Sequence, residues 1–267
     1  MSRKLELVLS AMVLLLAMAA SLAGLLVPGL YRDPEVLRPQ LYGQDLVTLV
    51  IGLPLLAAGM VGVAGDSLRG RVLWLGALGY LVYTYATYTF GAVWNPLFLV
   101  YAALLGLSTY TFVLGLLATS PEEALRTLAR LPRRTVGWFL AISAGVFALL
   151  WLADELGALV RGEVPRSVVA MQVPTNFIHA IDLAIVLPAL AIAGRLLLSR
   201  RPWGYLLGPV LLAKVVTLGA AVLAMAWFSA RRGFPADAVL NTVFVVVTLF
   251  AAALLGLSLR RAQPSGG

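Results

Sequence analysis

The sequence predicts an all-α membrane protein with eight transmembrane helices, arranged as two parallel four-helix repeats. Three observations indicate this fold class. The 267 residues are 61% hydrophobic and only 12% charged, with a mean hydropathy of +0.95, which is far more apolar than a soluble domain. The apolar residues gather in stretches of about 20, the length that crosses a hydrocarbon core as a helix. Several short motifs also recur in the same order in the two halves of the chain.

Charged residues and Pro/Gly-rich breaks separate eight apolar stretches, each long enough to cross the bilayer. They are Leu5–Val27, Asp45–Ala64, Val72–Val93, Leu97–Ala118, Val136–Leu156, Asn176–Leu198, Tyr205–Phe228 and Ala238–Leu259. A tight turn from Trp94 to Pro96 joins the third and fourth, so we expect these two to form a helical hairpin. The first stretch admits a second interpretation, a cleaved signal peptide, because it has a basic start and many small residues. Its apolar run continues to Val27, which favours a transmembrane helix.

Positive charge predicts the orientation, because loops rich in Lys and Arg remain in the cytoplasm. If both termini are cytoplasmic, thirteen Lys and Arg residues lie inside and six lie outside. The segment between the halves, "SPEEALRTLARLPRR", begins with Ser120, Pro121 and Glu122, which is typical of a helix start. We therefore expect repeats at 1–119 and 136–267. Residues 120–135 are expected to form a cytoplasmic amphipathic linker, lying either on the inner leaflet or in solvent.

The repeat prediction depends on motifs that match in order. "QDLVTLVIGLPLLAAG" in the second stretch resembles "IDLAIVLPALAIAG" in the sixth, which pairs Asp45 with Asp182 and the following prolines with each other. "WNPLFLV" and "LNTVFVV" pair Asn95 with Asn241, and "ALLGLS" occurs in both the fourth and the eighth stretches. Four crossings per unit make the two units parallel, related by an axis along the membrane normal. A polar cleft open to the outside would then lie between them.

Ionisable side chains within apolar stretches are costly and face the bundle interior, usually in pairs. His179, the only histidine, and Asp182 are three residues apart on one helical face. Lys214 lies at a depth within about one helical turn of Asp182 if each residue rises 1.5 Å. We therefore expect an Asp182–Lys214 ion pair, which either lines a binding site or only fixes the packing of two helices. Asp154 and Glu155 at the outer end of the fifth stretch are expected to be solvated.

Polar residues of the third stretch and of neighbouring stretches are expected to complete a polar core. The candidate binding residues are Asp182, Lys214, His179, Asp45, Tyr80, Tyr83, Thr84, Asn95, Thr217 and Asn241. Prolines within the second and sixth stretches are expected to bend those helices and free a carbonyl beside the site. With no cysteine and one histidine, the sequence predicts neither a metal site nor a cofactor. No catalytic residue is assigned, because hydrolase and nucleotide-binding motifs are missing.

The segment "PTNFIHAIDLAIVLPALAIAGRLLLSRRPWGYLLGPVLL" resembles a pattern found in uncharacterised bacterial multi-spanning membrane proteins. The shared positions are Pro174, Asn176, Asp182, Leu183 and Pro188, followed by the turn "RRPWGYLL". The resemblance covers roughly the last third of the chain. It implies a bacterial membrane location and no particular activity.

The favoured function is the binding or translocation of a small solute or proton through an outward-facing cleft in the bacterial cytoplasmic membrane. One alternative is a membrane-embedded enzyme that acts on a lipid or quinone-like substrate, and another is a non-catalytic assembly or sensor subunit. The expected partners are the lipid bilayer and a small molecule or proton. Nucleic acid is excluded, because no basic run interleaved with aromatic residues occurs. The oligomeric state stays open.

Overall fold

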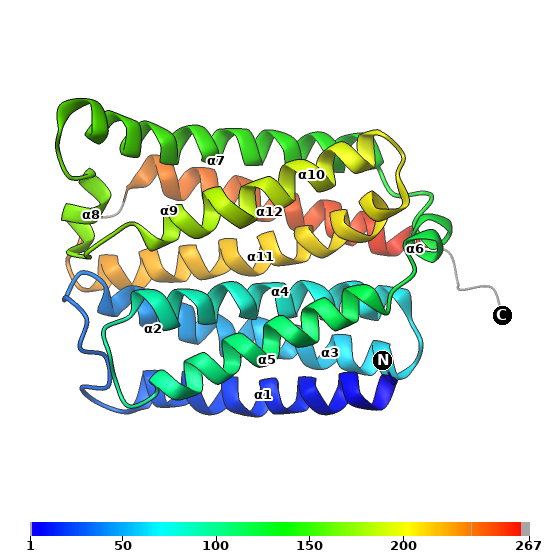
Figure 1. Cartoon of the computed structure of the whole chain (residues 1–267), viewed down its shortest axis with the longest axis horizontal. Helices are drawn as coiled ribbons and strands as arrows, with labels where there is room; N and C mark the ends of the chain where they lie inside the picture. Colours follow the sequence, from blue (N-terminus) through cyan, green and yellow to red (C-terminus); the bar gives the residue numbers. More distant parts are fainter. Residues whose placement is uncertain (1, 236, 263–267) are drawn as a thin grey trace.

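The computed structural model describes residues 2–235 and 237–262, and within these ranges every regular element is a helix. The elements are α1 (Arg3–Leu26), α2 (Arg38–Val47), η1 (Thr48–Gly52), α3 (Leu53–Ala64), α4 (Leu68–Gly91), α5 (Phe98–Leu117), α6 (Pro121–Thr127), α7 (Arg133–Arg161), α8 (Arg166–Met171), α9 (Phe177–Ile181), η2 (Asp182–Val186), α10 (Leu187–Leu198), α11 (Pro202–Arg231) and α12 (Ala238–Arg260). The long helices lie side by side in one bundle, and the short helices α6 and α8 lie at its opposite ends (Figure 1).

Seven helices in the described ranges are long and apolar enough to cross a membrane, so the chain is a multi-pass membrane protein. They are α1, the continuous α2–α3 segment, α5, α7, the continuous α9–α10 segment, α11 and α12. The 24-residue helix α4 is not among them, because it is rich in tyrosine, threonine and glycine. It nevertheless lies alongside α3, α5 and α11 in the middle of the bundle (Figure 1).

Two of the membrane helices contain a π-helical turn immediately before a proline. η1 ends just before Leu53 and Pro54, and η2 ends just before Leu187 and Pro188. In both, the leucine N–H bonds the carbonyl five residues earlier, so that Leu187 bonds Asp182. A proline has no N–H and its ring crowds the preceding turn, so a wider turn there relieves the clash. Each proline therefore coincides with a departure from regular α-helix, and the predicted bend with a freed carbonyl stays a prediction.

Several helices extend beyond their apolar stretches. α2 begins at Arg38 rather than at Asp45, and α7 runs from Arg133 to Arg161. The length of an apolar stretch matches only the thickness of the hydrocarbon layer. The hydrogen-bonded helix can continue into the polar layer on either side, so the helix is longer than the stretch. The short helix α8 was not predicted. It fills the connection between α7 and α9, and its first backbone N–H groups are accepted by Asp154.

The linker helix α6 begins as the sequence predicts, since the Ser120 side chain accepts the Glu123 N–H at 3.2 Å. It is only seven residues long, and Ala124 and Leu128 are fully buried. α6 packs against α11. It is therefore part of the end of the bundle, and in this structure it does not form a free surface helix.

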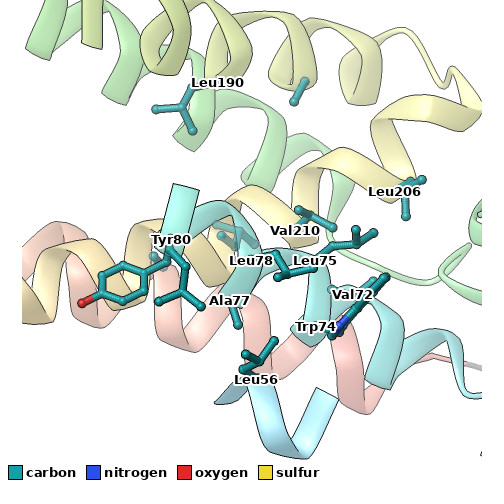
Figure 2. Packing of buried hydrophobic residues seen from close by; sticks show 14 of the residues in the cluster. Leu56, Val72, Trp74, Leu75, Ala77, Leu78, Tyr80, Leu190, Leu206 and Val210 are labelled. Carbon is teal, nitrogen blue, oxygen red and sulfur yellow. The ribbon is translucent and has the colours of Figure 1, made fainter. Parts of the chain in front are cut away.

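The centre of the molecule is the contact between α4 and α11. A Cβ added at Gly76 would lie 2.4 Å from the Ala213 Cβ, so the two backbones meet closely there. Figure 2 shows side chains of both helices, among them Leu75 and Val210, in the buried hydrophobic cluster. Trp74 is fully buried beside them and donates its Nε1 hydrogen to Ser10 of α1 at 2.8 Å.

Candidate functional site

A cavity of about 250 Å³ lies within the second half of the chain. Its walls come from α7, α9, η2, α10, α11 and α12, and side chains of α2 and α4 close it on the side of the first half. Most of the lining is apolar. The polar lining residues are Gln40, Gln44, Tyr83, Thr87, Ser143, Asp182 and Lys214.

Asp182 is the first residue of η2, and its side chain is only 8% exposed. Its Oδ2 accepts the Trp151 Nε1 hydrogen from α7 at 3.0 Å. Its Oδ1 is buried and accepts no hydrogen bond of normal geometry among the described residues, although the Tyr83 hydroxyl lies close to the carboxylate. A buried carboxylate oxygen without a donor is costly, so this atom marks a place where a ligand or water would be stabilised.

Lys214 lies in the middle of α11 and is 4% exposed. Its Nζ also has no hydrogen-bond partner within the described part of the chain, and it lies 4.3 Å from the centre of the Tyr83 ring. The ring face supplies a cation–π contact, which offsets only part of the loss of solvation. The predicted Asp182–Lys214 ion pair is not formed as a direct contact, since no N–O distance within 4.0 Å joins the two residues in the described ranges, although their charges are close enough to interact. Both residues line the cavity instead.

His179 does not line this cavity. Its ring stacks on the Trp151 ring with centroids 4.3 Å apart, and its Nδ1 lies 2.7 Å from Glu155 Oε1. The same Glu155 oxygen accepts the Asn176 side-chain amide at 2.6 Å. His179 therefore supports Trp151, whose indole N–H bonds Asp182. The expectation that Glu155 is merely solvated is wrong, because the folding of α9 against the end of α7 brings these groups together.

Asp154, Glu155 and His179 bring ligand atoms within 4.8 Å of one another, a spacing that suits a metal ion. Both oxygens of Asp154 and Oε1 of Glu155 already take part in hydrogen bonds. Asp154 accepts the Ser167 hydroxyl and the Arg166 backbone N–H at the start of α8. Through these contacts the cluster holds α8 and α9 against the end of α7.

Three of the predicted polar residues of α4 lie at or beside the cavity. Tyr83 lines it. Tyr80 and Thr84 lie behind Gln44 and accept its amide hydrogens at 2.9 and 2.7 Å. Gln44 is buried and was not predicted as a site residue. An amide side chain next to Asp45, close to the start of an apolar stretch, is the feature of the sequence that could have indicated it.

Asp45 lies away from the cavity, in a tyrosine cluster of the first half. Tyr31 donates its hydroxyl hydrogen to Oδ2, and Tyr88 donates to Oδ1 at 2.9 Å. The Tyr88 and Tyr101 rings stack with centroids 5.0 Å apart. A Cβ added at Gly24 of α1 would clash with the Asp45 carboxylate, so only glycine leaves room for it. Both oxygens of Asp45 accept hydrogen bonds, whereas only Oδ2 of Asp182 does so.

The remaining predicted residues have local structural contacts. Asn95 accepts the Leu97 N–H at 3.0 Å and closes the turn between α4 and α5. Thr217 returns its hydroxyl hydrogen to α11, with the Ala213 carbonyl at 3.1 Å. Asn241 lies in the first turn of α12, half-buried, and is not part of the cavity wall.

A second, smaller cavity of about 130 Å³ adjoins the first. The two share Gln40, Gln44, Thr87, Ile178 and Met225 as lining residues. The smaller one extends to Asp33, in the loop between α1 and α2, whose Oδ1 accepts the Val93 N–H at 2.9 Å. Burial raises the pKa of the Asp33 carboxyl above its usual range, although this hydrogen bond and nearby Arg38 act in the opposite direction.

No family model matches this chain, and no curated protein or solved structure is significantly similar to it. The geometry of the site is therefore the basis of the proposed function.

Proposed function

We propose that this protein binds a small solute inside the membrane, in the cavity that Asp182 and Lys214 line, as a carrier would. The observation that supports this is the pair of unsatisfied atoms, Asp182 Oδ1 and Lys214 Nζ, in the wall of one cavity. Leaving a buried polar group without a partner costs about 1–3 kcal/mol, and more for a charged one. A side-chain arrangement selected only for packing would join them directly. A ligand with a donor for Asp182 and an acceptor for Lys214 would satisfy both.

We also propose that the chain is a parallel duplication. The π-turn that begins at Thr48 recurs at Asp182, which is 134 positions later, and each is followed by Leu-Pro. α4 begins at Leu68 and α11 begins at Pro202, again 134 positions apart. This register pairs Asp182 with Thr48 and His179 with Asp45, so it differs by about one helical turn from the pairing that the motifs suggested.

Close contacts between the two halves repeat under the same shift. Gly43 of α2 meets the Met225 backbone of α11, and Gly91 of α4 meets the Phe177 ring of α9. The shift converts Gly43 into Phe177 and Gly91 into Met225, so the two contacts exchange partners. Contacts that exchange in this manner are the mark of a two-fold axis. Such an axis would pass near Gly76 and the Val210 carbonyl, which meet directly and are 134 positions apart.

In this arrangement the two halves have different polar residues at one pair of equivalent positions. The first half has Thr48 and Tyr80, joined by a hydrogen bond of 2.9 Å. The equivalent residues of the second half are Asp182 and Lys214, which are charged types and lack that direct bond. At this position the first half is therefore internally satisfied, whereas the second half is open to a ligand. This difference favours solute binding over a purely structural role for the charged residues.

α4 completes eight crossings in this proposal. Its length equals that of α1, at 24 residues. Its start lies beside the start of α1, where Arg71 bonds Glu6, and its end lies beside the α1–α2 loop, where Val93 bonds Asp33. Its tyrosines and threonines lower its hydropathy, but they face other helices rather than lipid. With an even number of crossings, both termini share one side, which the arginine distribution assigns to the bacterial cytoplasm.

The stability of unliganded variants tests the proposal first. Purified parent protein is compared with Asp182→Asn, Lys214→Met and the double variant in lipid nanodiscs. If the charges are kept for a ligand, the double variant is the most stable, because exchanging buried ionic groups for neutral ones often stabilises a protein by about 1–4 kcal/mol. A double variant less stable than the parent would indicate a structural pair instead.

Ligand response provides the second measurement. A thermal-shift screen of small zwitterions and neutral amphiphiles is expected to yield at least one compound that raises the melting temperature of the parent. That shift should vanish in both single variants and persist in Thr217→Val, a matched change one turn from Lys214 whose hydroxyl bonds only its own helix. An equal shift in all four proteins would place binding elsewhere.

A further inference from the structure

One wall of the cavity lies between α7 and α12, which both contribute lining residues. In the first half, the outer helices α1 and α5 pack directly against each other. In the second half, α7 and α12 make no comparably extensive backbone approach within the described residues. Two phenylalanine pairs bridge them, Phe147–Phe244 with ring centroids 5.3 Å apart and Phe139–Phe250 at 5.4 Å.

This phenylalanine seam, made by Phe139, Phe147, Phe244 and Phe250, lies between the cavity and the outer surface. Phe147 and Phe244 line the cavity itself. The seam itself reaches the outer surface, since the Phe250 side chain of α12 is apolar and 45% exposed. In a multi-pass protein such surfaces face hydrocarbon. Only side-chain contacts therefore separate the cavity from the bilayer interior on this side.

We infer that the cavity takes a lipid-soluble amphiphile, which reaches it from the bilayer through the phenylalanine seam. This inference rests on the proposed function, because Asp182 and Lys214 would hold the polar head. The head must combine a hydrogen-bond donor for Asp182 Oδ1 with an acceptor for Lys214 Nζ. It should carry no net charge, because the site already contains one acidic and one basic side chain. The apolar walls, among them Val186, Leu190 and Leu218, would surround a hydrocarbon tail.

The size of the cavity suits a short-chain ligand. About 250 Å³ is many times the roughly 10–15 Å³ that a single water needs. The cavity is therefore large enough for a short-chain amphiphile. Octane-1,2-diol is a suitable probe, because its hydroxyls both donate and accept hydrogen bonds and its tail is short.

The experiment uses the full-length protein in nanodiscs and an octane-1,2-diol analogue with a diazirine at the tail end. After illumination, mass spectrometry locates the labelled peptides, which are expected to come from α7, α11 and α12. Octane-1,2-diol should suppress the labelling, whereas glycerol, the head without the tail, and octane, the tail without the head, should not. Suppression by glycerol as effective as that by the diol would overturn the ligand class.

The route of access is tested with a bridge across the seam. The chain contains no cysteine, so Phe147→Cys combined with Phe244→Cys can be linked selectively by a short bifunctional thiosulfonate. Linking before the probe is added should abolish labelling, and linking after loading should trap the probe through a wash. The unlinked double variant is the reference, which separates a blocked route from a damaged site. Equal labelling whether the bridge is formed before or after the probe is added would overturn access from the bilayer. It would favour access through the second cavity, which shares Gln40 and Gln44 with the first.

The single variants of the charged residues keep the two proposals distinguishable. Asp182→Asn and Lys214→Met should each reduce labelling about tenfold or more, since a hydrogen bond to a charged group contributes about 1.5–3 kcal/mol. Full labelling in both variants contradicts the proposed function itself. Reduced labelling together with a bridge that has no effect contradicts only the inference about the seam.

Discussion

Individual buried carboxylates in this protein differ in how completely they are satisfied. Asp45 receives hydrogen bonds on both oxygens from tyrosines, and Glu6 receives both guanidinium nitrogens of Arg71 at 3.1 and 3.2 Å. Asp182 and Asp33 each keep one oxygen without a partner among the described residues. The first two residues stabilise helix contacts. The other two lie in cavity walls, where an unsatisfied oxygen is available to a ligand or to water.

Asp33 provides a pH test at the residue scale. Its pKa is raised in the folded state, so the folded protein takes up a proton while the unfolded chain is still ionised. Stability should therefore increase as the pH falls towards the usual value near 3.8, and this gain should be lost as the pH rises through the folded pKa. We expect Asp33→Asn to remove this part of the melting-temperature profile. Asp66→Asn, a change at an exposed aspartate, is the control, and an unchanged profile in Asp33→Asn would contradict the assignment.

Some site residues could be predicted from the sequence, and others could not. Asp182, Lys214 and Tyr83 were predicted as site residues, and they line one cavity. Gln44, Trp151 and Glu155 were missed as partners, because their roles depend on contacts between helices far apart in the sequence. Depth along a helix can be counted from 1.5 Å per residue, but the rotation of one helix against another cannot. For this reason the direct Asp182–Lys214 pair was expected and is not formed.

At the scale of elements, the long helices were predictable because hydrophobic length is a local property. All eight expected stretches are helical, and the ends of α5 and α12 lie within one residue of those predicted. The start of α2 and both ends of α7 lie several residues outside the predicted stretches, and the small helix α8 was not predicted. The π-turns show a finer limit. A proline indicates that an irregularity occurs, but the surrounding packing decides whether the helix kinks or widens.

Two glycines on α4 test the central helix contact. A Cβ at Gly76 would lie 2.4 Å from the Ala213 Cβ, whereas one at Gly79 would meet only ordinary contacts from 3.5 Å outwards. Gly76→Ala is expected to destabilise by about 1–3 kcal/mol through overpacking. Gly79→Ala should instead stabilise slightly, by up to about 1 kcal/mol, because alanine favours the helix. Chemical denaturation in matched detergent measures both changes, and similar effects of the two would contradict the close α4–α11 approach.

For the whole molecule, the ends of the helices indicate a single arrangement across the membrane. Figure 1 shows the start of α1 and the end of α12 at the same end of the bundle, beside α6. Arg3 bonds the Ala64 carbonyl there, and Arg69 bonds the Ala262 carbonyl. The loops at Glu35 and Glu163 lie at the other end, after α1 and α7. The predicted orientation places that end outside the cell.

Cysteine labelling tests this orientation at three exposed positions, in a chain without cysteine of its own. Single variants Glu35→Cys and Glu163→Cys should react with a membrane-impermeant maleimide in intact cells. Ala129→Cys, beside α6, should react only after the cells are opened. The reverse pattern would invert the topology, and reaction at Glu35 without reaction at Glu163 would remove α4 from the set of crossing helices.

The π-turn η2 also sets the phase of its helix. A five-residue turn adds one residue to the backbone path, and each residue of an α-helix turns the side chain through about 100°. Everything before η2, including His179, is therefore rotated relative to Leu187 and Leu190 compared with an uninterrupted helix. Removing Ile185, which is exposed at 64%, would restore a regular helix with little loss of packing. The same deletion would rotate the Asp182 carboxylate away from the cavity wall. A single residue in this turn therefore decides whether the segment contacts a ligand or only crosses the membrane.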